Sequence, residues 1–329
     1  MRSLGFLAVL LTVSCVYGQG VWYPLVYDNE TNNYFVPDVG VGTPPQLFNL
    51  RPNLSSWTTQ IPSKDCDSCT NTFDSTYSSS FSPMVFTPSG IRGYDLFQLY
   101  TVPEVNISFW QVFSDMEYGA IDGFIGFGYG ATVDTPNPPW YIQAAIDYNV
   151  EPYFSLFLDI AFPGESKMTL GNVDDTLYDG ELTYYPIISK VSSNYWVLDF
   201  DGIFVGSEAV ALECQKTETC YSVITASTDY ILGPSEEINN ILSHLGVLTN
   251  CSNFSSLENL YIVINGDSYE IPPKIYVKIV NGRCYPKFNT NHIDGTVNWM
   301  FGTSFLQSVY SVFNTNTNTI GLARSKSIR

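Results

Sequence analysis

The feature that most constrains how this chain can fold is an internal repeat of long period. Two apolar residues followed by glycine occur as Phe-Ile-Gly at 124–126 and again as Met-Phe-Gly at 300–302. The two glycines are 176 residues apart. A short polar segment precedes each copy, with Asn53 in the first half and Thr225 in the second, 172 residues apart. Self-similarity at a fixed spacing is the signature of a duplicated structural unit. The repeat therefore predicts two similar lobes.

Length and composition favour two lobes built from strands. The chain has 329 residues, more than a single hydrophobic core usually supports, and it contains 23 Tyr, 21 Phe and 19 Pro. Aromatic residues and frequent Thr, Val and Ile favour strands and turns. Asn265-Gly266 and Asn281-Gly282 predict tight turns after strands at 260–264 and 275–280. The fold class is therefore all-β.

Only two stretches have the pattern of a helix. Residues 140–148 form the first, and residues 235–245 form the second, with Ile238, Ile241 and Leu245 on one face and Ser235 in position to cap the first turn.

The charge balance excludes two classes of partner. The chain has 14 basic and 32 acidic residues and a formal net charge of −18. Phosphate groups of nucleic acid or of an anionic membrane would be repelled, so we expect neither partner. A solvated acidic surface explains this charge, and a preference for cationic ligands is the alternative.

The N-terminus has the pattern of a secretory signal peptide. A basic residue, a short apolar core and small residues precede an expected cleavage after Gly18, and the apolar core is too short to span a membrane. We therefore expect a soluble protein, secreted or lumenal, with residues 1–18 removed. Cys15 leaves with the signal, and the six remaining cysteines suit an oxidising compartment.

Several motifs together resemble the pepsin-like aspartic protease family. Gly-Thr-Pro-Pro-Gln at 42–46 and Ile-Pro-Ser at 61–63 frame the first active-site segment, and Gly233-Pro234 closes the second. The resemblance extends from about residue 34 to residue 323. It implies an N-terminal lobe at 19–188 and a C-terminal lobe at 189–329, whose last strands return to a sheet between the lobes. It also implies a peptide-binding cleft that the two lobes flank.

In this register the two catalytic aspartates of the family fall on Asn53 and Thr225. Family catalysis uses two carboxylates that share a proton, but an amide and a hydroxyl do not titrate near neutral pH. The surrounding cleft loops also differ: Leu54 and Ala226 replace threonines, and Ser55 and Ser227 replace glycines. Ser56 and Thr228 complete these two loops. The resemblance therefore implies a protease homologue with no intact catalytic residue.

Two further positions bear on activity. The flap of the family is expected near residues 86–95, which lack its Tyr-Gly, and Phe86 is the candidate to replace the tyrosine, the alternative being a core or rim residue. Asp229 and Asp122 are the acids nearest to the motifs, but Asp229 is out of register and Asp122 is a turn residue in the family. Val21 follows the signal almost directly, so we expect no inhibitory propeptide.

The resemblance also narrows the possible disulfides to Cys66–Cys69, Cys214–Cys220 and Cys251–Cys284. A redox or zinc site at Cys66 and Cys69 is the alternative, but the chain has only two histidines, and we expect no metal and no cofactor. Five glycosylation sequons fit a secreted glycoprotein, at Asn29, Asn53, Asn106, Asn250 and Asn253. Of these, we expect Asn53 to stay unmodified on the cleft floor, the alternative being a glycan that plugs the cleft.

Three functions are consistent with these observations. The first is an inactive homologue, monomeric, that binds an extended peptide or protein in the cleft, because strand-like hydrogen bonding there does not need the carboxylates. The second is an active endopeptidase that uses a non-standard acid. The third is a structural or storage glycoprotein whose cleft binds nothing.

Overall fold

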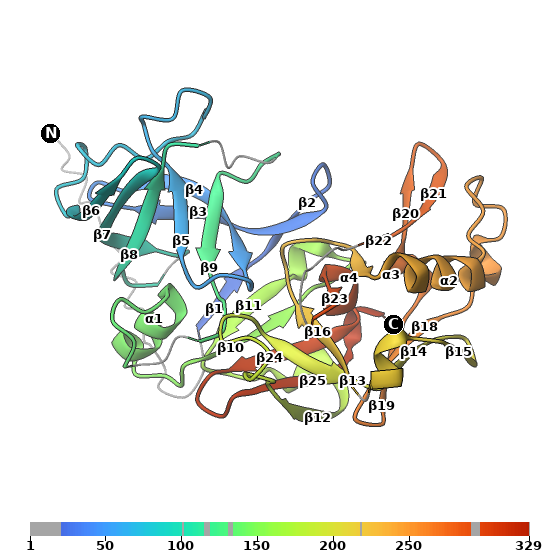
Figure 1. The fold of residues 1–329 in the computed structure, drawn as a ribbon. Coiled ribbons are helices and arrows are strands. Elements are labelled where there is room, and N and C mark those ends of the chain that lie inside the picture. Colours follow the sequence, from blue (N-terminus) through green and yellow to red (C-terminus); the bar gives the residue numbers. More distant parts are fainter. Residues whose placement is uncertain are drawn as a thin grey trace, which may run out of the picture.

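A computed structural model describes residues 21–100, 102–114, 119–130, 134–217, 219–290 and 297–328. The expected signal peptide and His292 lie outside these residues. The protein has two β-rich lobes and few helices, which confirms the prediction of an all-β, two-lobed fold (Figure 1).

The N-terminal lobe is built on an eight-stranded sheet in the order β2-β3-β4-β9-β5-β8-β7-β6. Along β8, alternate residues Ile107 and Phe109 are buried, as expected for a strand with one face on a core. The strands are β2 (Val26–Asp28), β3 (Asn33–Val41), β4 (Gln46–Asn53), β5 (Thr59–Pro62), β6 (Ser82–Thr87), β7 (Gly90–Gln98), β8 (Val105–Val112) and β9 (Gly123–Gly126).

A six-stranded sheet joins the lobes and takes strands from both ends of the chain, in the order β1-β11-β10-β24-β25-β12. Its strands are β1 (Val21–Pro24), β10 (Tyr153–Phe157), β11 (Lys167–Leu170), β12 (Tyr178–Pro186), β24 (Val309–Asn314) and β25 (Thr319–Ser325). Phe154 on β10 stacks on Phe313 of β24 with ring centroids 4.9 Å apart. The last strands therefore lie in this sheet, while a lobe boundary at residues 188 and 189 stays a prediction.

The C-terminal lobe contains two larger sheets and one small one. Their orders are β13-β16-β23-β17-β22, β15-β14-β18-β19 and β20-β21. The strands are β13 (Val197–Phe200), β14 (Gly202–Val205), β15 (Glu208–Val210), β16 (Cys220–Ile224), β17 (Ile231–Gly233), β18 (Leu260–Ile264), β19 (Asp267–Ile271), β20 (Val277–Val280), β21 (Arg283–Pro286), β22 (Phe288–Thr290) and β23 (Trp299–Phe301).

Two of the helices, α1 (Trp140–Tyr148) and α2 (Ser235–Leu245), have the predicted bounds. The capping role expected for Ser235 is wrong: the chain is extended at Pro234, Ser235 is already the first helical residue, and no side chain caps the helix. The α-helices of the described residues also include the short α3 (Pro273–Tyr276) and α4 (Thr303–Leu306). None of these helices is long and apolar enough to cross a membrane within the described part of the chain.

Both predicted tight turns are confirmed, Asn281-Gly282 connecting β20 to β21, but the strand before the second turn is shorter than predicted. Asn265 and Gly266 have φ angles of 48° and 84° and connect β18 to β19. The second strand begins at Val277 and not at Ile275, because the preceding prolines fix φ values that suit a helical turn, and α3 forms there.

The structure contains three disulfides, which join the pairs that the family resemblance implies. They are Cys66–Cys69, Cys214–Cys220 and Cys251–Cys284. The first closes a loop just after β5, the second joins the turn at Glu213–Thr217 to the first residue of β16, and the third joins the loop after α2 to β21.

Candidate functional site

The two polar segments of the repeat occupy equivalent places in the two lobes. Asn53 is the last residue of β4, which runs parallel to β9, and it lies opposite Gly126. Thr225 directly follows β16, which runs parallel to β23, and its N–H donates to the carbonyl of Phe301. Each polar loop thus begins beside one of the repeated motifs, which carry Gly126 in β9 and Gly302 just after β23.

Close backbone approach explains the glycines of these strands. A Cβ added to Gly126 would lie 2.3 Å from the backbone of Trp57, and one added to Gly302 would lie 2.4 Å from the carbonyl oxygens of Thr228 and Tyr230. Backbone atoms cannot move aside as a flexible side chain can, so both positions require glycine. Gly126 and Gly302 therefore allow the backbone contacts that hold the two polar loops in place.

Four side chains from the two loops meet between the lobes; we name them the floor cluster. Within each loop, Ser55 N–H donates to Asn53 Oδ1 at 2.9 Å, and Ser227 N–H donates to Thr225 Oγ1 at 3.1 Å. Between the loops, Ser55 Oγ lies 3.0 Å from Thr225 Oγ1, and Ser227 Oγ donates to Asn53 Oδ1 at 3.3 Å. The cluster therefore has two-fold character, with each serine reaching across to the other loop.

All four side chains of the floor cluster are neutral. An amide and three hydroxyls donate and accept hydrogen bonds but do not exchange protons in the physiological range. Thr225 is fully buried, and Asn53 is half-buried. The cluster can therefore hold a polar ligand group or a water molecule, but it cannot take a proton from either.

The remaining cleft-loop residues that the sequence singled out support this arrangement. Leu54 is fully buried and Ala226 is 8% exposed, so both pack into the hydrophobic core. Ser56 Oγ accepts from Thr58 N–H, and Thr228 Oγ1 accepts from Tyr230 N–H, each fixing the turn that follows.

Arg51 adds a second link between the lobes that sequence reasoning missed. Its Nη1 donates to the carbonyl oxygen of Ser227 at 3.1 Å, and its guanidinium lies 4.5 Å from the ring centre of Phe124. Alternation along β4 could have indicated it, because Arg51 lies two residues before Asn53 and so faces the same side.

The two acids nearest to the motifs have other contacts. Asp122 Oδ2 accepts from Asn49 N–H at 2.6 Å, as befits a turn residue. Asp229 is 5% exposed, and its carboxylate lies 4.0 Å from the ammonium of Lys287, which is 7% exposed. Burial raises the pKa of Asp229, and the positive charges of Lys287 and Lys278 offset part of this rise. Burial lowers the pKa of Lys287.

The flap candidate Phe86 lies near the end of β6, on the hairpin that β6 forms with β7. It is 71% exposed, and neighbouring Met84 and Val85 are 40% and 46% exposed. Phe86 is therefore not a core residue, and its role over the cleft stays a prediction.

The glycosylation candidates differ in accessibility. Asn29, Asn106 and Asn250 are exposed. Asn253 is half-buried, and its amide nitrogen donates to the carbonyl of Gly246 at 2.9 Å. Of the adjacent pair, Asn250 is thus the more accessible.

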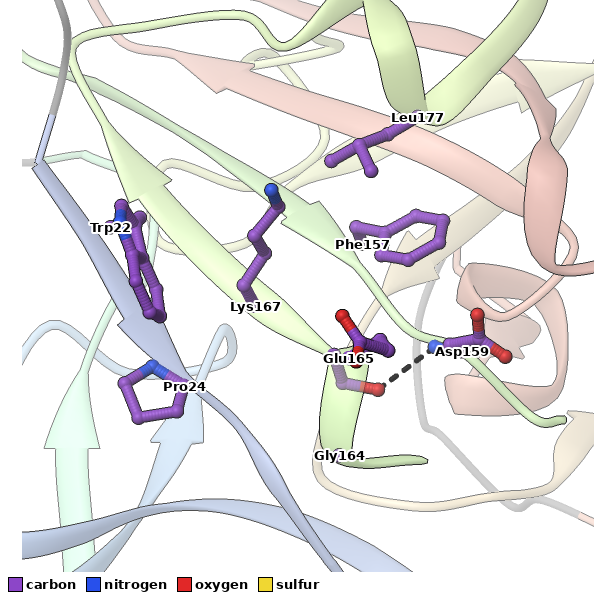
Figure 2. A pocket seen from close by; sticks show the side chains of 9 residues that line it. Trp22, Pro24, Phe157, Asp159, Gly164, Glu165, Lys167 and Leu177 are labelled. Carbon is purple, nitrogen blue, oxygen red and sulfur yellow. Dashed lines mark hydrogen bonds between the residues drawn. The ribbon is translucent and has the colours of Figure 1, made fainter. Parts of the chain in front are cut away.

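A pocket of about 420 Å³ is lined by none of the floor-cluster residues and lies beside strands β1, β10 and β11 of the six-stranded sheet (Figure 2). Trp22, Pro24 and Phe157 form its apolar walls, and Lys167 extends between them. Lys167 is already paired with Asp174 at 2.9 Å. No group of three or more potential metal-binding side chains occurs among the described residues.

Comparison with known proteins identifies the family of the chain. The sequence profile of the family described as eukaryotic aspartyl protease matches residues 33–325, and the chain therefore belongs to that family. It is similar to pepsin A of Bos taurus, with 27% identity over 91% of this chain and 87% of the relative. It is also similar to pregnancy-associated glycoprotein 1 of Sus scrofa, with 26% identity over 89% and 81% of the two chains. Vacuolar protease A of Arthroderma otae is 29% identical over 92% and 81%.

Proposed function

We propose that this chain is a proteolytically inactive member of the aspartyl protease family that binds an extended peptide or protein in the cleft between its lobes. In this proposal Asn53 and Thr225 occupy the positions of the two catalytic aspartates. The lobes comprise residues 19–188 and 189–329, and the protein is a monomer that is secreted, or retained in a lumen, after loss of residues 1–18.

The floor cluster is the observation that carries the proposal. The family reaction needs one group to accept a proton from water and another to donate a proton to the peptide carbonyl. Each such group contributes roughly 10² to 10⁴ in rate. In the floor cluster, Asn53 and Thr225 supply neither, and Ser55 and Ser227 already bond to them across the gap.

The geometry does not support Asp229 as a substitute for a missing catalytic aspartate. The carboxylate of Asp229 is buried against Lys287, and no hydrogen bond of the described residues joins it to the floor cluster. A working protease that uses this acid would need the loop to rearrange.

Peptide binding does not depend on the missing acids. An extended ligand binds through main-chain hydrogen bonds and through pockets for alternate side chains. Pepsin-family proteins bind peptides in the cleft between their lobes. The Thr225 loop is held here by backbone hydrogen bonds, such as the one from Thr225 N–H to the carbonyl of Phe301.

Hydrolysis of a denatured, fluorescently labelled protein between about pH 3 and 5 tests the loss of activity, with bovine pepsin A as the positive control. We expect no cleavage above the buffer blank. Cleavage that a statine-type inhibitor blocks would establish an active endopeptidase and overturn the proposal.

Selection from a random peptide library tests binding. We expect enriched sequences whose binding is lost in Ser227→Phe, where the larger side chain fills the space at the floor cluster. Binding should be kept in Ser207→Phe, which changes an exposed serine in the turn between β14 and β15. A library that returns no enriched sequence would favour a structural or storage glycoprotein.

A further inference from the structure

Strands β20 and β21 form an arm that projects from the C-terminal lobe (Figure 1). Within the described residues these strands pair only with each other. Val277 at the base of the arm and Cys284 near its turn are buried on one face, and Cys284 is bonded to Cys251. The arm is therefore fixed along this face and offers the other.

One face of the arm combines two cations with two apolar side chains. The register places Lys278 opposite Tyr285 and Val280 opposite Arg283. Opposed residues, and residues two apart on a strand, point to the same side. Val280 is 39% exposed and Tyr285 is 42% exposed. We call these four residues the arm face.

The arm face is positive on an otherwise acidic molecule. Residues 272–293 contain four of the 14 basic residues and none of the 32 acidic ones. Lys278 and Arg283 form no ion pair and no side-chain hydrogen bond with any residue that the structure describes. At physiological salt, charges act over about 8 Å, so a ligand at the arm face senses these cations more than the net charge of −18.

The arm is continuous with the loop that carries Thr225. Lys287, which directly follows β21, accepts a hydrogen bond from Ile231 N–H at 3.0 Å. Ile231 begins β17, which pairs with β22. The residue after the arm is therefore hydrogen-bonded to the strand that follows the Thr225 loop.

We propose that the arm face is a docking surface for an acidic, extended segment of a partner protein. Lys278 and Arg283 are diagonal neighbours, roughly 7 to 8 Å apart at their Cα atoms. Carboxylates two residues apart on an extended chain are about 7 Å apart, which matches this spacing. Apolar residues of the partner would then contact Val280 and Tyr285. A symmetric contact between two copies would place their arm-face cations against each other, which opposes self-association through this surface.

This surface lies outside the floor cluster and goes beyond the proposed function, so it can be tested whether or not the cleft binds a ligand. The probe is a short fluorescein-labelled peptide with Glu at alternate positions and Thr or Phe between them. The control probe has Lys in place of each Glu. Anisotropy of each peptide with the full chain should show binding of the Glu peptide alone, weaker at higher salt.

The test variant is Lys278→Glu with Arg283→Glu. Its matched control is Lys190→Glu with Lys216→Glu, two exposed lysines whose reversal changes the net charge equally. We expect the arm variant to weaken binding of the Glu peptide at least about tenfold and the control to change it less than about twofold. Both variants should keep the wild-type Tm.

Four outcomes would overturn the proposal. They are failure of the Glu peptide to bind, equal weakening by the two variants, a dimer in sedimentation that the arm variant dissociates, and arm-dependent binding to phosphatidylserine vesicles. The third would identify a second copy, and the fourth a lipid surface, as the partner of the arm.

Discussion

Ser55 and Ser227 lie two residues beyond Asn53 and Thr225, and each bonds to the opposite loop. In the proposed register both serines replace glycines, so their side chains occupy space that the family leaves open. The inactivity that we propose therefore has two parts: the missing carboxylates and the hydroxyls between them.

Restoring the acids alone should not restore the enzyme. We expect Asn53→Asp with Thr225→Asp to remain below about 1% of the kcat/KM of bovine pepsin A, because a displacement of about 1 Å can cost 10²-fold. Adding Ser55→Gly and Ser227→Gly should raise cleavage at least about tenfold over the double variant. Cleavage of a quenched fluorescent peptide measures both, and robust activity of the double variant would show that the serines matter little.

The buried pair of Asp229 and Lys287 predicts a pH dependence of stability. Burial raises the pKa of Asp229 above its usual 3.8, Lys287 and Lys278 offset this in part, and Tyr27 is the other titratable group near it. The folded state thus holds the proton more tightly than the unfolded state. The contribution of Asp229 is fully present below the unfolded pKa and is lost as the pH rises through the folded pKa.

The free energies of unfolding of the wild type and of Asp229→Asn, compared across pH, should show this loss of stability with rising pH. The stability advantage of the wild type, measured by urea unfolding, should fall as the pH rises from below 3.8 through the raised pKa of the folded state. Asp67→Asn, which removes an exposed aspartate, controls for the loss of one surface charge. A wild-type advantage that grows with pH would contradict the assignment.

At the scale of elements, β9 and β23 support the two polar loops through close backbone contact. Gly302→Ala places a methyl group against two carbonyl oxygens of the Thr225 loop. We expect a loss of at least about 2 kcal/mol in the free energy of unfolding, because fixed backbone atoms cannot relax as a side chain does. Urea unfolding measures this change.

The matched control is Gly164→Ala, where an added Cβ meets no atom within 4 Å. We expect a change within about 0.5 kcal/mol. Equal losses for the two variants would show that the tight packing around Gly302 is not what stabilises the loop.

At the scale of the whole molecule, the six-stranded sheet makes the lobes interdependent. Strand β10 pairs with β24 and β12 pairs with β25, so the N-terminal half of the chain relies on its last strands. Trp196 packs on Phe313 in the same region, with ring centroids 5.0 Å apart. Separate folding of residues 19–188 would expose two strand edges and part of the core.

We therefore expect a fragment of residues 19–188 to lack native tertiary structure. Near-UV circular dichroism should show no aromatic signal, whereas residues 19–329 should unfold in one cooperative transition. A well-dispersed amide spectrum of the fragment would show that this lobe is an independent domain.

Local signals in the sequence were enough for the fold class and for several elements. The bounds of α1 and α2 follow from their apolar spacing, and the β18–β19 hairpin follows from Asn265-Gly266, because helix periodicity and turn geometry are properties of a few neighbouring residues. The cap at Ser235 and the start of β20 were misjudged, since adjacent prolines changed the local backbone in both places.

The sequence by itself determined the family, the two-lobed β architecture and the residue types in the two polar loops. These properties follow from motif spacing and amino-acid composition, which the sequence gives directly. Only the tertiary structure decided that Ser55 and Ser227 exchange hydrogen bonds between the loops, and that Arg51 joins the lobes. These contacts connect residues more than 150 positions apart, and no local pattern encodes which side chains meet when two separately built lobes pack together.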